Sequence, residues 1–121
     1  MVSHARFKNL SYEDFQKMAT NQSLSRNEKV GFPDTYRAGK ELEIFEDIKS
    51  KLPSLQLNGS VTLDIGCGCS DIPRYLIKNA KKRGQTLMLL DSKEMLSQLP
   101  DDNAVKKIPA RYPDCPQLLE D

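Results

Sequence analysis

Residues 61–71, which read VTLDIGCGCSD, constrain the fold more than any other part of the chain. The apolar run at their start contains a single acid, Asp64, and predicts a strand over residues 61–65. Gly66 and Gly68 then predict a turn, and a helical pattern follows it. A parallel strand that leads through a glycine turn into a helix is how α/β folds build a nucleotide-sized pocket, because glycine lets the main chain approach a ligand closely.

The residues of the turn bear on which ligand such a pocket would take. A dinucleotide fingerprint needs a third glycine at the position of Asp71, where a carboxylate suits a helix N-terminus but would repel a pyrophosphate. No Gly-Lys-Ser or Gly-Lys-Thr follows, as a phosphate-binding loop requires. The turn therefore favours an adenosine-type ligand without phosphates, such as S-adenosylmethionine, and disfavours a nicotinamide-dependent oxidoreductase.

A second apolar run, over residues 86–90, ends in Asp91 about twenty residues after the glycine turn. An acid at the tip of a second strand is placed to accept hydrogen bonds from both ribose hydroxyls of a nucleoside. The alternative is that Asp64 and Asp91 are strand-end carboxylates that cap nearby helices. Residues 104–108 predict a third strand.

Two motifs in this region resemble those of the class I S-adenosylmethionine-dependent methyltransferases. Residues 63–68 (LDIGCG) are similar to the glycine-loop motif of that family, and residues 89–96 (LLDSKEML) are similar to its second-strand acid motif. With the helix between them they span roughly residues 60–97. One departure is Ser70, where the family often has a third glycine. The resemblance implies a Rossmann-like parallel sheet with flanking helices, and methyl transfer with S-adenosylmethionine as the cofactor.

The resemblance also implies roles for single residues. Asp64 matches the acid that orients the methionine end of the cofactor, Asp91 matches the ribose-binding acid, and Ser92 and Met95 fall where the family often touches the adenine. Because an N-terminal segment often folds over the cofactor in related enzymes, we expect Tyr36 or Arg37 at the pocket, the arginine pairing with the cofactor carboxylate. The alternative is a surface arginine and a packed tyrosine. The expected cofactor-binding residues are Asp64, Gly66, Cys67, Gly68, Asp91, Ser92, Met95 and Arg37. No general base can be named, although Asp71 and Tyr75 lie near the pocket by position.

The order of these elements divides the chain into an N-terminal helical segment, residues 1–57, and a partial Rossmann-like domain, residues 58–121. The family's domain typically has seven strands, and this chain supplies about three. We therefore expect the N-terminal half of a longer methyltransferase, or a shortened relative. The first strand would then be an exposed apolar edge, which predicts self-association.

In the N-terminal segment, Ser11 and Asp14 predict a capping box and a short helix. We expect a polar loop over residues 21–27, and then one long helix from residue 34 or 35 to about residue 52. Apolar residues recur along this long helix and predict packing against the sheet, with partner binding as the alternative: Leu42, Phe45, Ile48 and Leu52. Another helix should follow the glycine turn, dock on the sheet and end at Gly84, its docking residues being Ile72, Tyr75, Leu76 and Ala80.

Composition narrows the function classes. The net charge of +1 gives no strong nucleic-acid signal, and the basic cluster near residues 78–83 suits the end of a helix better than it suits an RNA site. Cys67 and Cys69 lack enough partners for zinc, since only Cys115 and His4 remain. We expect no metal, no membrane contact, a cytoplasmic location and a small-molecule methyl acceptor. The alternative function is an inactive, methyltransferase-like binding module.

Overall fold

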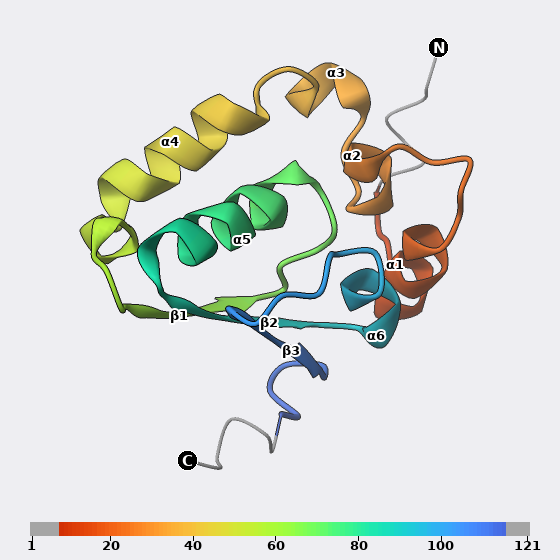
Figure 1. The fold of residues 1–121 in the computed structure, drawn as a ribbon. Helices are drawn as coiled ribbons and strands as arrows, with labels where there is room; N and C mark the ends of the chain where they lie inside the picture. The colour runs from red at the N-terminus through yellow and green to blue at the C-terminus, as the bar shows by residue number, and fades with distance from the viewer. Residues whose placement is uncertain (1–7, 116–121) are drawn as a thin grey trace.

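The structure is a computed structural model that describes residues 8–115. Three strands, β1 (Val61–Ile65), β2 (Thr86–Asp91) and β3 (Val105–Pro109), form one parallel sheet in the order β1-β2-β3 (Figure 1). The helix α5 (Asp71–Arg83) connects β1 to β2, and the short α6 (Lys93–Leu96) precedes β3. The predicted α/β fold with a parallel sheet is thus confirmed, with β3 one residue later in the chain than expected.

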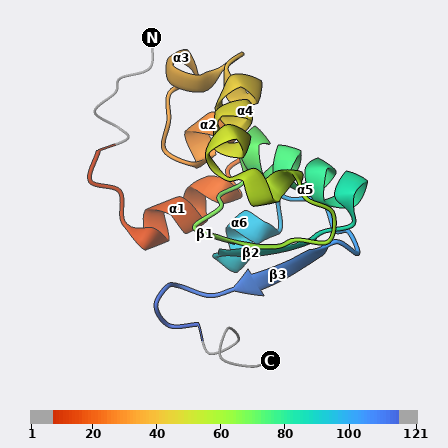
Figure 2. The same cartoon turned by 90° about the vertical axis from the view of Figure 1, so that its left-hand side faces the viewer.

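The two faces of the sheet are covered differently. All the labelled helices lie on one side, and the chain after β3 lies on the other (Figure 2). Leu87 and Leu89 of β2 belong to the core on the helical side, whereas Leu90 and Ile108 pack under Cys115 on the opposite side. The side chains of β1 on that opposite side remain exposed, namely Val61, Leu63 and Ile65. Parallel sheets normally bury both faces, so this apolar surface is unusual.

The N-terminal segment begins with α1 (Tyr12–Ala19), which has the predicted capping box: the Ser11 hydroxyl accepts the Asp14 N–H, and the Asp14 carboxylate accepts the Ser11 N–H. The expected loop over residues 21–27 is wrong in its last two residues, because α2 (Arg26–Lys29) begins there. A second capping box, between Ser25 and Glu28, starts this helix.

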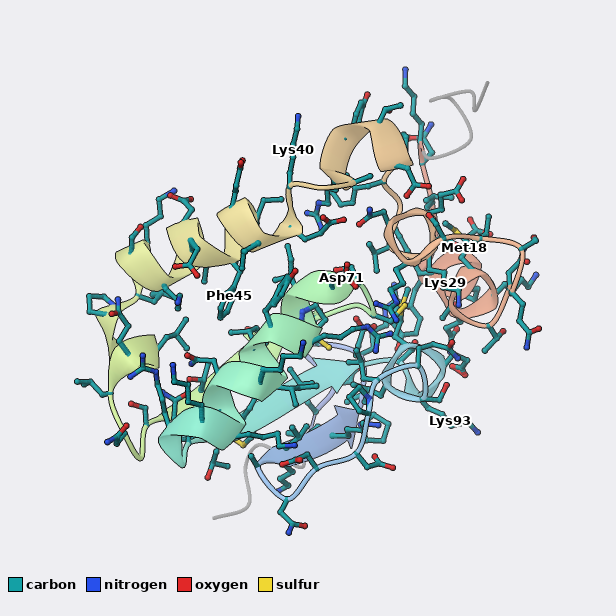
Figure 3. The ribbon with its side chains drawn as sticks, turned by 45° about the horizontal axis from the view of Figure 1, so that its top comes forward. Met18, Lys29, Lys40, Phe45, Asp71 and Lys93 are labelled. Carbon is teal, nitrogen blue, oxygen red and sulfur yellow. The ribbon has the colours of Figure 1, made fainter. Side chains whose placement is uncertain are left out.

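The single helix expected from residue 34 to residue 52 is also wrong, because the chain forms α3 (Asp34–Arg37) and α4 (Glu41–Lys51) instead. Gly39 lies between them with φ +79°, a left-handed conformation that interrupts the helix. Lys40, at this break, points away from the molecule (Figure 3). A 3-10 turn, η2 (Pro53–Gln56), then leads toward β1.

The apolar stripe of α4 is only half buried. Phe45 is buried and points toward α5, where its ring stacks on Tyr75 with the centroids 5.5 Å apart (Figure 3). Leu42 and Leu52, by contrast, are 53% and 52% exposed. The expectation that α4 packs on the sheet is corrected here, because α5 lies between α4 and the sheet (Figure 1). A helix that meets one other helix buries a narrower row of side chains.

Helix α5 joins the sheet to the N-terminal segment. Gly84 ends it in a left-handed conformation, as predicted, and Leu76 and Ala80 are buried as docking residues. Ile72 and Tyr75 are only partly buried, whereas Pro73 and Ile77 are buried without having been expected. The Asn79 amide donates to the carbonyl of Leu55 over 2.8 Å, which ties η2 to α5. Within residues 8–115, none of the helices combines the length and the apolarity that crossing a bilayer demands.

Candidate cofactor-binding site

The turn between β1 and α5 bends over the carboxyl end of β2. Gly66 and Gly68 both have positive φ, at +73° and +68°, which side chains with a Cβ rarely adopt. The Gly66 N–H donates to the Leu90 carbonyl at 2.8 Å, and the Gly68 N–H donates to Oδ2 of Asp91 at 2.8 Å. The glycine turn is therefore held against the tip of the neighbouring strand by a charge-assisted hydrogen bond.

The Asp91 carboxylate is half-buried and accepts a second main-chain hydrogen bond, from the Ser92 N–H to Oδ1 at 2.7 Å. An ionised carboxylate offers about four lone-pair positions. Two are thus engaged by main-chain amides, and about two remain for hydroxyl groups of a ligand. The helix-capping alternative is not seen for Asp91, because the Gly68 and Ser92 amides both precede the helices and α6 is capped by the Ser92 hydroxyl.

A cavity of about 240 Å³ lies beside this turn. It brings together four of the predicted cofactor-binding residues, Gly66, Gly68, Asp91 and Met95, which come from three different segments of the chain. Its remaining walls are side chains of the N-terminal segment, which were not among the expected site residues: Tyr12, Phe15 and Val30. The sequence signal that bears on these walls is the pair of capping boxes, which indicates that α1 and α2 are folded helices.

Val30 closes the cavity against the glycine turn. A Cβ built on Gly68 would lie 2.6 Å from Cγ1 of Val30, so this position requires glycine for its contact as well as for its φ. The cavity is smaller than the roughly 300–1,000 Å³ that small-molecule sites usually provide. A whole nucleoside with an amino-acid tail would therefore have to displace the segment around Val30.

Tyr12 is the polar member of the N-terminal wall. Burial raises the pKa of its phenol, and the charges of Asp91 and Glu94 raise it further. The guanidinium of Arg111 lies 4.6 Å from the centre of the Tyr12 ring. Tyr12 is thus a neutral hydrogen-bond donor and acceptor close to the Asp91 carboxylate.

Asp64 lies on β1 opposite Leu89, on the side of the sheet that the helices cover. The pKa of Asp64 is raised to about 6, mainly by burial and to a smaller extent by the negative charge of Asp91. The two acids therefore lie near each other at one end of the sheet, as a shared ligand site requires. Asp64 does not line the cavity, so its expected contact with the methionine end would need an intervening water or a loop amide.

Cys67 sits in the turn with its thiol directed to the Gly68 carbonyl at 3.4 Å. Burial raises the pKa of this thiol well above its usual range, and Asp64 and Asp91 add to the effect. Burial likewise raises the pKa of Cys69. Both thiols stay protonated at neutral pH, which makes them packing residues of the turn and poor nucleophiles.

Two predicted site residues have other contacts. The Ser92 hydroxyl accepts the Met95 N–H at 3.2 Å and so caps α6, while its side chain is buried. Arg37, in α3, lies over the ring of Phe32 with its guanidinium carbon 3.9 Å from the ring centre, and it does not line the cavity. The other N-terminal candidate, Tyr36, is 51% exposed. A cofactor contact by Arg37 stays a prediction that requires α3 to move.

The remaining candidates lie elsewhere. Asp71 pairs with Arg26 at 2.6 Å, and Tyr75 stacks on Phe45, so neither faces the cavity as a base. Within residues 8–115, no three His, Cys, Asp or Glu side chains are grouped as metal ligands; His4 lies outside this range. In the basic cluster, Lys81 pairs with Asp102 at 3.1 Å and Arg83 binds the Gln56 carbonyl, which gives both residues structural partners.

Comparisons of the chain with protein-family models, with curated proteins and with solved structures found no match. The resemblance to the methyltransferases therefore rests on the two sequence motifs.

Proposed function

We propose that this chain is the cofactor-binding part of a class I S-adenosylmethionine-dependent methyltransferase with a Rossmann-like sheet. The observation that carries the proposal is the Asp91 carboxylate. It is anchored by the Gly68 and Ser92 amides, and it faces a cavity with free lone pairs at the tip of the second strand. This is the position from which an acid can accept both hydroxyls of a ribose.

The other residues of the cavity suit the remaining parts of such a ligand. Met95 and Phe15 offer an apolar wall for an adenine ring, and the Gly66–Gly68 main chain offers a surface for the amino-acid tail. When bound, S-adenosylmethionine supplies a methyl group on an activated sulfonium leaving group. The chain's own contribution is to position this group for in-line attack and to exclude water from it.

The acceptor that we propose is a small molecule. The chain carries a net charge of only +1, and the basic residues at the end of α5 are paired or solvated. We also propose a cytoplasmic protein, because three free cysteines suit a reducing compartment.

Isothermal titration of the full chain with S-adenosylmethionine and S-adenosylhomocysteine tests the proposal. We expect micromolar binding that Asp91→Ala weakens at least about tenfold, since it removes a charge-assisted hydrogen-bond acceptor. Asp47→Asn is the matched control, because Asp47 is an exposed acid of α4 that pairs only with Lys51 among the described contacts. NAD serves as the competing ligand, and heat released by NAD alone would favour an oxidoreductase.

A folded chain that binds neither S-adenosylmethionine nor S-adenosylhomocysteine would contradict the proposal. It would favour the second candidate function, an inactive module that acts by association with a partner. One observation supports this candidate independently. The edge strand β1 has no neighbour on its outer side among the described residues, and its apolar side chains Val61, Leu63 and Ile65 are exposed. Such an edge can pair with a second copy of the chain.

A further inference from the structure

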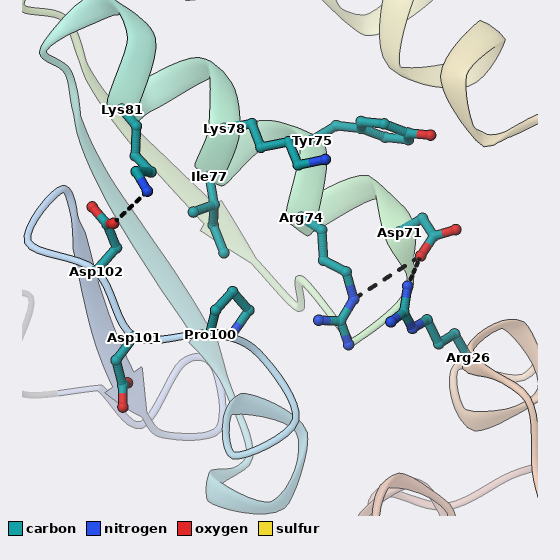
Figure 4. Close-up of a pocket in the computed structure, with 10 residues that line it drawn as sticks. All are labelled: Arg26, Asp71, Arg74, Tyr75, Ile77, Lys78, Lys81, Pro100, Asp101 and Asp102. Carbon is teal, nitrogen blue, oxygen red and sulfur yellow. Dashed lines mark hydrogen bonds and ion pairs between the residues drawn. The ribbon is translucent and has the colours of Figure 1, made fainter.

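A groove separate from the cavity at the glycine turn runs between α5 and the loop that follows α6 (Figure 4). Its volume is about 470 Å³, and it shares no lining residue with the smaller cavity. Ile77 points into it from α5, and Pro100 faces Ile77 from the loop (Figure 4). The middle of the groove is therefore apolar, and its charged residues gather toward the ends.

One end of the groove has more positive than negative charge. Oδ1 of Asp71 is 2.6 Å from Nη1 of Arg26 and 4.0 Å from Nε of Arg74, so two guanidinium groups share one carboxylate (Figure 4). Burial lowers the pKa of Arg74, and the charge of Arg26 lowers it further. Lys78 also lines the groove and has no ion pair within residues 8–115. Lys78 lies one helical turn after Arg74 on α5, so three cations and a single acid line this part of the groove.

Arg74 is fixed in place but has an unused donor. Its Nη2 donates to the carbonyls of Gln98 at 2.9 Å and Cys69 at 3.3 Å, which hold the guanidinium against the loop. Its Nε is buried and lacks any hydrogen-bond acceptor, since 4.0 Å to Asp71 is too long for a hydrogen bond. A buried donor without an acceptor destabilises the folded chain, and a ligand oxygen that reached it would remove that cost.

The other end of the groove is balanced. Lys81 pairs with Asp102 at 3.1 Å, and Asp101 pairs with Lys107 at 2.8 Å while its side chain is 94% exposed. Since neither pair leaves an unbalanced charge, the excess of two positive charges belongs to the end formed by Arg26, Arg74 and Lys78. An excess of this size matches a dianion better than a monoanion.

We propose that this groove binds a small phosphomonoester. Its phosphate lies among Arg26, Arg74 and Lys78, and its apolar body lies over Ile77 and Pro100. Guanidinium groups suit phosphate because their N–H donors match its oxygens, and the ammonium of Lys78 adds a point charge. This site does not depend on the proposed methyltransferase activity, because it uses none of the residues of the glycine-turn cavity.

Titration of the full chain with phenyl phosphate, followed by two-dimensional amide NMR at low salt, tests the proposal. We expect saturable shifts in α5 and in residues 97–102. Phenyl phosphate should bind at least about fivefold more tightly than inorganic phosphate, which lacks the apolar body, and more tightly than benzoate, which has one charge. Absence of saturable binding, or equal affinity for all three probes, would overturn the proposal.

Variants locate the site. Lys78→Gln and Arg26→Gln should each weaken phenyl phosphate binding about fivefold or more, because each removes a cation from the phosphate. Lys82→Gln is the matched control, since Lys82 is an exposed lysine of α5 outside the groove, and it should change the affinity less than about twofold. An equal loss in Lys82→Gln would show general charge attraction and overturn the site. Titration of the same variants with S-adenosylmethionine keeps a failure here distinct from a failure of the proposed function.

Discussion

Strands β1 and β2 pair with each other, and each carries apolar side chains and one acid near its carboxyl end. Their apolar side chains differ in how far they are exposed to solvent. Leu87, Leu89 and Leu90 of β2 are at most 2% exposed, whereas Val61, Leu63 and Ile65 of β1 are 39–66% exposed. The sequences of the two strands also differ, because β1 (VTLDI) alternates apolar and polar residues whereas β2 (TLMLLD) has apolar residues on both faces. Part of the difference comes from the face of the sheet, because Leu87 and Leu89 lie under the helices whereas the exposed side chains of β1 lie on the opposite face. Part of it comes from position, because β2 has a strand on each side and β1 has one.

The acids of the two strands differ in the same way. Asp91, at the end of the central strand, receives N–H donors from the glycine turn and from its own loop, and it faces a cavity. Asp64, one position before the end of the edge strand, lies under the helices with a raised pKa of about 6. The Asp91 carboxylate is thus positioned by donors beside a cavity, whereas burial of Asp64 favours its protonated form.

Alanine substitutions in the two strands should show the largest effect. Leu89→Ala removes a fully buried side chain and should lower the free energy of unfolding by about 3 kcal/mol, while Leu63→Ala should cost about 1 kcal/mol or less. Urea denaturation followed by far-UV circular dichroism measures both. Equal losses would mean that the open side of β1 is covered in solution, and Leu89→Val against Leu63→Val repeats the comparison with milder changes.

The two acids should differ next in ligand binding. Asp91→Asn keeps the size of the side chain but loses the charge, and it should weaken S-adenosylmethionine binding about tenfold or more. Asp64→Asn should weaken it only about two- to threefold, because Asp64 does not line the cavity. Titration calorimetry on the two variants provides the comparison. A larger loss from Asp64→Asn would reverse the roles assigned to the two acids.

Asp64 also predicts a pH dependence. The pKa of Asp64 is about 6 in the folded chain against 3.8 for an unperturbed aspartate, so as the pH rises the folded state keeps this proton to a higher pH than the unfolded state does. Stability should therefore fall as the pH rises from about 4 to about 6 and then level off. Solvent screening at a half-buried group reduces the effect to roughly 1–2 kcal/mol.

The variant Asp64→Asn isolates this contribution. The difference in unfolding free energy between Asp64→Asn and the original chain should grow in favour of the variant from about pH 4 to about pH 6. Chemical denaturation at a series of pH values measures it, and other titrating groups cancel because they are common to both proteins. A difference that stays constant across this window would show that the carboxylate is well solvated.

Much of the sheet could be predicted from the sequence because its signals are local. The apolar runs, the glycine turn and Gly84 each fix a boundary within a few residues of its own position. The break at Gly39 was missed because an isolated glycine inside a helical pattern does not by itself reveal its φ. The walls Tyr12, Phe15 and Val30 were missed because they depend on how α1 packs on α6 and how Val30 meets the glycine turn, and the capping boxes predict the helices but not this packing.

Self-association through β1 tests the comparison of the two strands by another route, because a second copy could cover the side chains of β1 that are exposed in the single chain. If the open edge pairs with a second copy, Leu63→Lys should raise the dimer dissociation constant about tenfold, since it places a charge on the apolar surface that would be buried. Lys106→Gln, on β3 beside Met88, is a control that changes charge away from the β1 edge. Sedimentation equilibrium over a range of concentrations measures both. A chain that stays monomeric at high concentration would show that the exposed edge of β1 is tolerated without a partner.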